Sequence, residues 1–283
     1  MEIFRLQELP YAGEDDTQRS YDLYFPLDER QFLPEKPSAD PPVIIFVHGG
    51  AWRSEDKGDH RPLAEELVRR TRACVAVPNY RLSPRTPPLH HPTHAADLLT
   101  FLAYLYNVGY QTARGTLRRT RWYLVGHSCS AHMIASIVLD SSAATPSLAP
   151  PAGMLAAVRG VVFSEGIYDL DALLKKWPEY GKWFIHDAFG EKTDYSAFSV
   201  AKYPARKSDI RWLLLHSSGD ELVDLGQTEI MGTHLRAIHE GELDAVTTDT
   251  NVLTDKHDDV LKNEYYLSKV SQFVLDLDNR VQV

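Results

Sequence analysis

Short apolar runs alternate along the chain with longer amphipathic stretches. The runs are four or five residues long and rich in aliphatic and aromatic side chains, a pattern typical of buried strands. Strands that alternate with helices predict an α/β fold, with a mostly parallel sheet flanked by helices on both faces. The predicted strands are Tyr21–Phe25, Val43–Val47, Ala73–Val77, Trp122–Val125, Gly160–Phe163 and Trp212–Leu215.

The stretches between these runs predict the covering helices. Their apolar side chains return at intervals of three or four residues, so one face of each helix can be buried on the sheet. Two strand-like runs near the beginning of the chain favour an antiparallel start, which makes the sheet mixed at one edge. The helices are predicted at Pro62–Thr71, at His94–Tyr106, directly after Ser128 and at Thr228–Ile238, and the two early runs are Ile3–Leu9 and Tyr21–Phe25.

The alternation breaks down between Glu165 and Val200, where periodicity is weak and aromatic residues are frequent. In open α/β sheets, ligands bind beyond the carboxyl ends of the strands, which is where this segment must emerge. We therefore predict a single domain over residues 1–283 with a small aromatic-rich, cap-like insertion at about 166–200. Tyr168, nearest to the strand end, is its best candidate for a substrate contact.

Composition and charge narrow the class of protein. With 283 residues, 43% of them hydrophobic, the chain can bury a core of domain size. A net charge of −9 would repel polyanions, so we expect no nucleic acid partner. We see neither a secretory signal nor an apolar stretch that could span a bilayer, and expect a cytoplasmic protein without membrane contact. Only Cys74 and Cys129 are present, which fits a reducing compartment and no disulfide framework.

Three neighbouring histidines need an explanation because histidine is a common metal ligand. His90, His91 and His94 lie close together, but Pro92 prevents a regular helical display of their rings. Zinc sites usually add cysteine or carboxylate ligands at fixed spacings. We interpret this stretch as a surface loop before a helix and predict neither a metal nor a cofactor.

The most informative motif lies at a predicted turn from strand to helix. Its sequence is Gly126-His127-Ser128-Cys129-Ser130. In a nucleophile elbow the serine sits on a strained turn, and the residues two before and two after it are small because strand and helix nearly touch. Gly126 and Ser130 meet this demand, although glycine is usual at both positions. Ser128 is therefore the candidate nucleophile.

A second motif supplies candidate hydrogen-bond donors. The strand Val43–Val47 runs directly into His48-Gly49-Gly50. Successive glycines let main-chain N–H groups face a reacting carbonyl without interference from a Cβ. An oxyanion hole of this type combines the N–H of the residue after the nucleophile, here Cys129, with an N–H from this loop. Gly50 is the favoured loop donor and Gly49 the alternative.

An activated serine needs a histidine to take its proton and an acid to hold that histidine. Asp220 follows the last predicted strand of the sheet interior, at its carboxyl end, and is the candidate acid. Asp224 is the fallback, although its place before a predicted helix also fits a helix cap. His257, the last histidine of the chain, lies in a polar loop and is the candidate general base. The histidines interpreted as structural are His216, His234 and His239.

Together, these motifs resemble the α/β-hydrolase fold over nearly the whole chain. The loop His48–Trp52, closed by a tryptophan, and the segments Pro78–Pro84 and Glu165–Leu170 resemble the kynurenine formamidases, especially the fungal type. The chain departs from the elbow pattern at Ser130. The resemblance implies a serine hydrolase that cleaves N-formyl-L-kynurenine to L-kynurenine and formate in tryptophan catabolism. Trp52 joins Tyr168 as a candidate substrate contact.

Two other functions remain open at this point. A carboxylesterase of the hormone-sensitive-lipase type uses the same three residue types and a related glycine loop, and would differ in its substrates. A hydrolase-fold protein that only binds a ligand would need none of these residues to react. The expected partner is a small-molecule substrate, and a homodimer is an open option.

Overall fold

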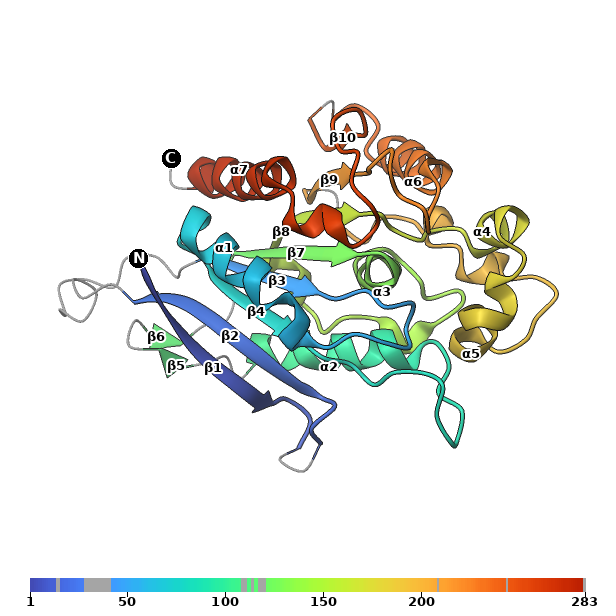
Figure 1. The fold of residues 1–283 in the computed structure, drawn as a ribbon, viewed down its shortest axis with the longest axis horizontal. Coiled ribbons are helices and arrows are strands. Elements are labelled where there is room, and N and C mark those ends of the chain that lie inside the picture. The colour runs from blue at the N-terminus through green and yellow to red at the C-terminus, as the bar shows by residue number, and fades with distance from the viewer. Residues whose placement is uncertain are drawn as a thin grey trace.

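Figure 1 shows the fold in the computed structural model, which describes residues 1–13, 16–27, 42–107, 111–112, 115–116, 121–207, 209–242 and 244–281. An eight-stranded sheet has the strand order β1-β2-β4-β3-β7-β8-β9-β10. The strands are β1 (Glu2–Pro10), β2 (Ser20–Leu27), β3 (Val43–Val47), β4 (Cys74–Pro78), β7 (Trp122–His127), β8 (Val158–Ser164), β9 (Arg211–Leu215) and β10 (Val246–Asp249).

The predicted mostly parallel sheet and its mixed edge are both confirmed. β1 pairs antiparallel with β2, and β2 pairs antiparallel with β4. All pairings from β4 through β10 are parallel. Each predicted strand is present. The bounds of Val43–Val47 match those of β3, and the other strands have slightly different ends, because an apolar run marks the buried middle of a strand better than its termini.

Helices cover both faces of this sheet, as predicted. The longer helices are α1 (Arg61–Thr71), α2 (Thr93–Asn107), α3 (Cys129–Val138), α6 (Leu225–Ile238) and α7 (Glu264–Val281). The short elements are α4 (Leu170–Lys176), a π-helix (Gly181–Ile185), α5 (His186–Phe189), the hairpin strands β5 (Gln111–Thr112) and β6 (Gly115–Thr116), and 3₁₀ turns at Lys57–His60, Pro146–Leu148, Met154–Ala157, Ser196–Phe198, Val200–Lys202 and Asp259–Lys262.

Two hydrophobic cores form because successive side chains of a strand point to opposite faces of the sheet. In β3, Ile45 and Val47 join a core with residues of α2, α3 and α6, whereas Ile44 and Phe46 join a second core with residues of α1 and α7. The central strands are apolar on both faces because both faces are covered. This packing fixes the carboxyl ends of β3, β7, β8 and β9, where the candidate site residues follow.

The segment after β8 lies beyond these strand ends. Its short helices α4 and α5 sit beside one another, on the side toward which β3 and β7 point (Figure 1). A single domain with a cap-like insertion at about 166–200 stays a prediction. Within the described part of the chain, we find no helix with both the length and the apolar character needed to cross a membrane.

Candidate active site

Ser128 occupies a strained turn between β7 and α3. Its backbone angles, φ 57° and ψ −126°, are rarely adopted by residues with a side chain, and such strain concentrates at functional sites. A Cβ on Gly126 would lie 2.8 Å from Cδ1 of Ile134 and 3.0 Å from the backbone nitrogen of Ala131. Strand and helix therefore approach one another as closely as a nucleophile elbow requires.

Ser130, where the elbow pattern has glycine, uses its hydroxyl to join two parts of the site. Its Oγ accepts a hydrogen bond from the His127 N–H at 2.8 Å and lies 2.6 Å from the carbonyl oxygen of Val47. The residue is completely buried. Val47 is the last residue of β3, so this contact connects the elbow to the strand that carries the glycine loop.

The glycine loop after β3 leaves main-chain donors free. Gly50 has a φ of +82°, and a Cβ on it would stand 2.2 Å from the carbonyl oxygen of Ser54. Only glycine tolerates both conditions. Among the contacts of the described residues, none has the N–H of Gly49, Gly50 or Cys129 as its donor. These are the N–H groups that an oxyanion hole would use.

Two buried side chains, Cys129 and Tyr80, hold the glycine loop after β3 in place. The sulfur of Cys129 accepts a hydrogen bond from the Trp52 N–H at 3.2 Å. The hydroxyl of Tyr80 donates to the carbonyl oxygen of Gly49 at 2.7 Å, and the Tyr80 ring stacks on His48 with centroids 4.5 Å apart. Burial raises the pKa of the Cys129 thiol to about 12, so it stays protonated and is no nucleophile at neutral pH.

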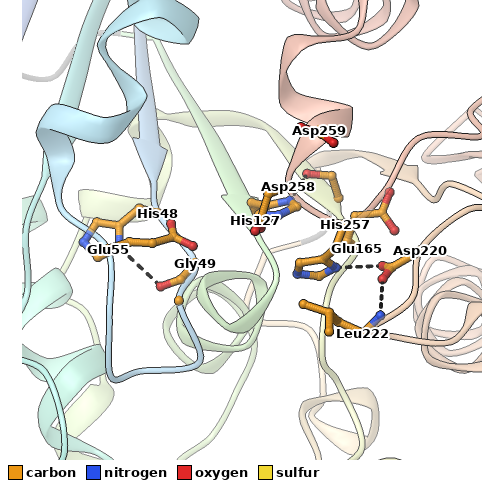
Figure 2. Close-up of polar contacts among 12 residues, drawn as sticks. His48, Gly49, Glu55, His127, Glu165, Asp220, Leu222, His257, Asp258 and Asp259 are labelled. Carbon is orange, nitrogen blue, oxygen red and sulfur yellow. Dashed lines mark hydrogen bonds and ion pairs between the residues drawn. The ribbon is translucent and has the colours of Figure 1, made fainter.

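His257 and Asp220 are joined by a hydrogen bond of 2.8 Å between Nδ1 and Oδ2, as Figure 2 shows. The other oxygen of Asp220 accepts from the N–H groups of Leu222 at 2.8 Å and Val223 at 2.9 Å. Burial acts to raise the pKa of Asp220, but hydrogen bonds with His257 and Glu165 outweigh it and hold the pKa well below its usual range. Asp220 is therefore an ionised partner for a histidine.

Asp224, the alternative acid, has a different role. Its side chain accepts a hydrogen bond from the Gly226 N–H at 2.9 Å and so caps α6. The remaining histidines of this region also have structural partners. The contacts are His216 Nδ1 to Thr228 Oγ1 at 2.9 Å, His234 Nε2 to the Tyr203 carbonyl oxygen at 2.8 Å, and Trp212 Nε1 to His239 Nε2 at 3.0 Å.

Ser128 and His257 open into the same small cavity, of about 200 Å³. No hydrogen bond joins Ser128 to His257 among the contacts of the described residues, and such bonds often tighten only once a substrate is bound. Gly50 forms part of the wall, next to the nucleophile. The other lining residues are Ala51, Ser54, Glu55, Ile167, Tyr180, Trp183, Phe184, Leu222, Val223 and Asp258.

The two predicted substrate contacts, Trp52 and Tyr168, are not part of this wall. Trp52 is fully buried, and its ring packs edge-on against Phe189 and His132, with centroids 5.1 Å and 5.7 Å apart. Tyr168 is also fully buried and packs on Phe163 at 5.7 Å. Neither side chain lines the cavity, so we leave both out of the proposed substrate contacts.

Sequence reasoning missed the aromatic side chains that do line the cavity. Tyr180, Trp183 and Phe184 come from the segment between α4 and α5. Their spacing of three and four residues is the signal that could have found them, because it places all three on one side of a helical turn. Two acidic residues, Glu55 and Asp258, also belong to this wall.

Both wall carboxyl groups are held in their ionised form. Burial acts to raise the pKa of Glu55, but the hydrogen bond and charge of His60, at 2.9 Å, lower it. The contact of Asp258 with His127 lowers the pKa of Asp258. The cavity therefore combines an apolar aromatic side with a negatively charged one.

Two groups of histidine and carboxylate side chains come close enough to resemble metal sites, namely His127 with His257 and Asp258, and Glu165 with His216 and Asp220. Each contains a member of the candidate triad, and the His257–Asp220 hydrogen bond already occupies one donor and one acceptor. We assign no metal to either group.

His90 and His91 lie in the loop before α2 and His94 lies in its first turn, and the prediction of a surface position is wrong for two of the three. His91 stacks on Phe189 with ring centroids 5.0 Å apart, and His94 Nε2 lies 3.0 Å from the Ser83 hydroxyl. His91 and His94 are buried, whereas His90 is exposed. The His91 N–H donates to the carbonyl oxygen of Ala188 in α5 at 2.6 Å. 

Comparison with known proteins agrees with this geometry. The BD-FAE family model matches residues 31–235. The kynurenine formamidase of Meyerozyma guilliermondii is 34% identical over 207 residues, covering 69% of this chain and 71% of that protein. The kynurenine formamidase of Eremothecium gossypii is 28% identical over 242 residues, covering 83% of this chain and 92% of that protein.

Solved structures show the same fold at lower identity. A C6-C4 SN3-inhibited esterase B from Lactobacillus rhamnosis has a TM-score of 0.73 at 16% identity, covering 99% of this chain and 88% of that one. A bifunctional GH43-CE protein of Bacteroides eggerthii has a TM-score of 0.68 at 18% identity, covering 95% of this chain and 37% of that one. The chain has the α/β-hydrolase fold, and it belongs to the BD-FAE family and, within it, to the kynurenine formamidases.

Proposed function

We propose that this protein is a serine hydrolase that cleaves the formamide bond of N-formyl-L-kynurenine to give L-kynurenine and formate. The observation that carries the proposal is the cavity that Ser128, His257 and Gly50 line together, with the N–H of Gly50 donating to no other group among the described residues. The membership of the chain in the kynurenine formamidase family supports the choice of substrate.

In the first half of the proposed reaction, Ser128 Oγ attacks the formyl carbon while His257 takes the hydroxyl proton. Asp220, hydrogen-bonded to Nδ1 of His257, stabilises the resulting imidazolium. The N–H groups of Gly50 and Cys129, with Gly49 as the alternative loop donor, hold the oxyanion. The C–N bond then breaks, and His257 gives its proton to the departing aniline nitrogen.

The second half returns the enzyme to its starting state. Water attacks the formyl ester on Ser128, and His257 takes a proton from that water. The same N–H groups hold the second oxyanion. Formate leaves as the bond to Ser128 Oγ breaks, and Ser128 recovers its proton from His257.

The cavity suits this substrate in size and in lining. Its volume of about 200 Å³ lies below the range of about 300–1,000 Å³ for drug-sized ligands, so a long acyl chain would not fit. Trp183 and Phe184 offer an apolar wall to the aromatic ring of the leaving group. The ionised carboxylates of Glu55 and Asp258 would attract the α-ammonium group of the kynurenine tail.

The proposal is tested by measuring formate release from N-formyl-L-kynurenine, with a short-chain p-nitrophenyl ester run in parallel. We expect release that depends on serine, is lost in Ser128→Ala, and exceeds turnover of the ester. Asp220→Asn should lower kcat by about 10⁴-fold, the loss typical of a triad acid. Asp224→Asn is the matched control, and it should retain activity because Asp224 caps α6. Rapid ester cleavage without formate release would identify an esterase instead.

We also propose a cytoplasmic location with a small molecule as the partner. Cys74 and Cys129 are both buried and are not joined in a disulfide, as a reducing compartment would allow. A homodimer stays a prediction, and size-exclusion chromatography with light scattering would decide it.

A further inference from the structure

Glu165 is a buried acid beside the candidate triad that the reaction above does not use. It follows β8 directly and is completely buried, with a φ of +53°. A residue other than glycine with positive φ, held in a buried position, is a strained feature of the kind that concentrates at functional sites. Its carboxyl group lies close to that of Asp220 (Figure 2).

The contacts of Glu165 leave one of its oxygens for Asp220. Oε1 accepts a hydrogen bond from the Ser217 N–H at 2.9 Å. Oε2 is completely buried, lies 3.4 Å from Nδ1 of His216, and accepts no hydrogen bond among the described residues. A carboxyl oxygen of Glu165 lies within 4.8 Å of one of Asp220. Two carboxyl groups form a hydrogen bond only if one of them carries a proton, because an ionised carboxylate can only accept.

The surroundings decide which carboxyl group holds that proton. Asp220 accepts three N–H donors, from His257, Leu222 and Val223, and so is the ionised partner. Within the part of the chain that the structure describes, Glu165 accepts one N–H donor, from Ser217. Burial, with the hydrogen bond and charge of Asp220, raises the pKa of Glu165 to about 10.

Among the described residues, no salt bridge joins Glu165 to a lysine or an arginine, and its nearest titratable nitrogen belongs to His216. Nε2 of His216 lies 3.2 Å from the Val223 carbonyl oxygen, which can only accept, so this nitrogen carries the ring proton. Burial lowers the pKa of His216, and its ring is therefore neutral. The other titratable groups that act on Glu165 or feel its charge are Asp255, Tyr168 and Tyr266.

We propose that Glu165 is a positioning residue of the triad, which donates a hydrogen bond from its protonated carboxyl group to the carboxylate of Asp220. This inference rests on the proposed serine-hydrolase mechanism. The bond restrains Asp220 so that Oδ2 faces His257, and it keeps the pair of acids at one negative charge. The catalytic acid therefore works in a buried site without repulsion from a second carboxylate.

This arrangement also sets how strongly Asp220 favours a protonated His257. A carboxylate that accepts a strong hydrogen bond is less basic, because its charge is partly neutralised. Without that donor, Asp220 would stabilise the imidazolium more, and the base would stay protonated to higher pH. The acidic limb of the activity profile should then move upward in pH, which loss of packing alone would not cause.

The test compares Glu165→Gln with Glu165→Ala by the rate at which a fluorophosphonate labels Ser128 across a pH series. This probe needs an activated serine but no particular substrate. The glutamine amide can donate to Asp220 and accept from Ser217, so we expect labelling within about threefold of wild type and an unchanged acidic limb. The alanine variant should label about 10- to 100-fold more slowly, the loss of a hydrogen bond to a charged group. Its acidic limb should lie about one pH unit higher.

The proposal would be overturned if Ser128 labelling were slowed equally in Glu165→Gln and Glu165→Ala and the acidic limb of the pH profile were unchanged in both. Infrared spectroscopy gives a second readout that needs no activity and no alanine variant. The infrared difference spectrum between wild type and Glu165→Gln at pH 7 should contain the C=O stretch of a protonated carboxylic acid. A difference spectrum with a carboxylate band alone would also overturn the proposal. If the wild-type protein is not labelled at all, the serine-hydrolase mechanism fails, and the infrared band still decides the protonation of Glu165.

Discussion

Replacing Glu165 with glutamine should change how the stability of the protein depends on pH. In the folded chain Glu165 keeps its proton up to a pKa of about 10, whereas an unfolded glutamate loses it near ~4.3. Between these values folding takes up one proton. The free energy of unfolding therefore falls as the pH rises, and the contribution is lost completely above the folded-state pKa.

The magnitude follows from this linkage. Each pH unit inside the window lowers the free energy of unfolding by about 1.4 kcal/mol, or about 4 kcal/mol between about pH 6 and about pH 9. Glutamine does not titrate, so Glu165→Gln escapes this loss. The difference in Tm between the variant and wild type should grow by roughly 8 °C over that interval. Asp220 does not disturb the comparison, because its lowered pKa makes its contribution disappear only in strong acid.

The assay is thermal or urea unfolding of both proteins at matched ionic strength in steps of one pH unit. The slope of the difference is the diagnostic quantity, because any constant effect of the substitution cancels. Glu229→Gln, on the exposed part of α6, is the matched control and should run parallel to wild type. If the difference in free energy of unfolding between Glu165→Gln and wild type stayed constant with pH, the reasoning would be refuted, because Glu165 would then be ionised in the folded protein.

Three further substitutions test the walls of the site. Ser130→Gly removes the contacts with His127 and Val47 and should cost about 1–2 kcal/mol of stability, and a denaturation curve identical to wild type would contradict the connecting role of its hydroxyl. Gly50→Ala places a Cβ against Ser54 and should reduce kcat by about 10²- to 10³-fold in formate-release assays, with unchanged kcat ruling out Gly50 as a donor. Trp183→Ala opens the leaving-group wall and should raise KM for N-formyl-L-kynurenine about tenfold while Ser128 labelling persists; an unchanged KM would place the ring elsewhere.

The features that depend on strand order could be predicted from the sequence. Apolar runs identify strands that are buried on both faces, and the carboxyl ends of parallel strands meet at one edge of the sheet. A serine, a glycine loop and an acid that each follow such a run must therefore come close together. The bond between His257 and Asp220, from distant parts of the chain, is what this reasoning expects.

The directions of side chains in loops could not be predicted in the same way. Trp52 closes the glycine loop, but its φ of +59° and the Trp52 N–H bond to Cys129 accompany a ring that packs in the core. Tyr168 is likewise buried, with its N–H bound to the side chain of Gln227 at 2.8 Å. These orientations depend on residues far away in the chain, which a local motif does not contain.

The protonation of Glu165 is a further property that no linear pattern contains. From the sequence, a glutamate that follows an apolar strand could equally be an ionised residue exposed to solvent at the end of that strand. Its neutral state depends on the closeness of Asp220, a residue on a different strand end, and on the absence of solvent. Only the tertiary structure brings these conditions together.

The division of the cavity wall between two parts of the chain has a consequence for how such enzymes diverge. The reacting groups follow sheet strands: Ser128 stands in the turn after β7, and Asp220 lies in the loop after β9, where the N–H groups of Leu222 and Val223 hold it. The aromatic wall comes instead from one contiguous stretch, Tyr180–Phe184, between two short helices. A few substitutions or an exchange of that stretch could alter the accepted leaving group while the bond-breaking machinery is inherited intact. Descendants of one ancestor could in this way acquire new substrates in small, viable steps.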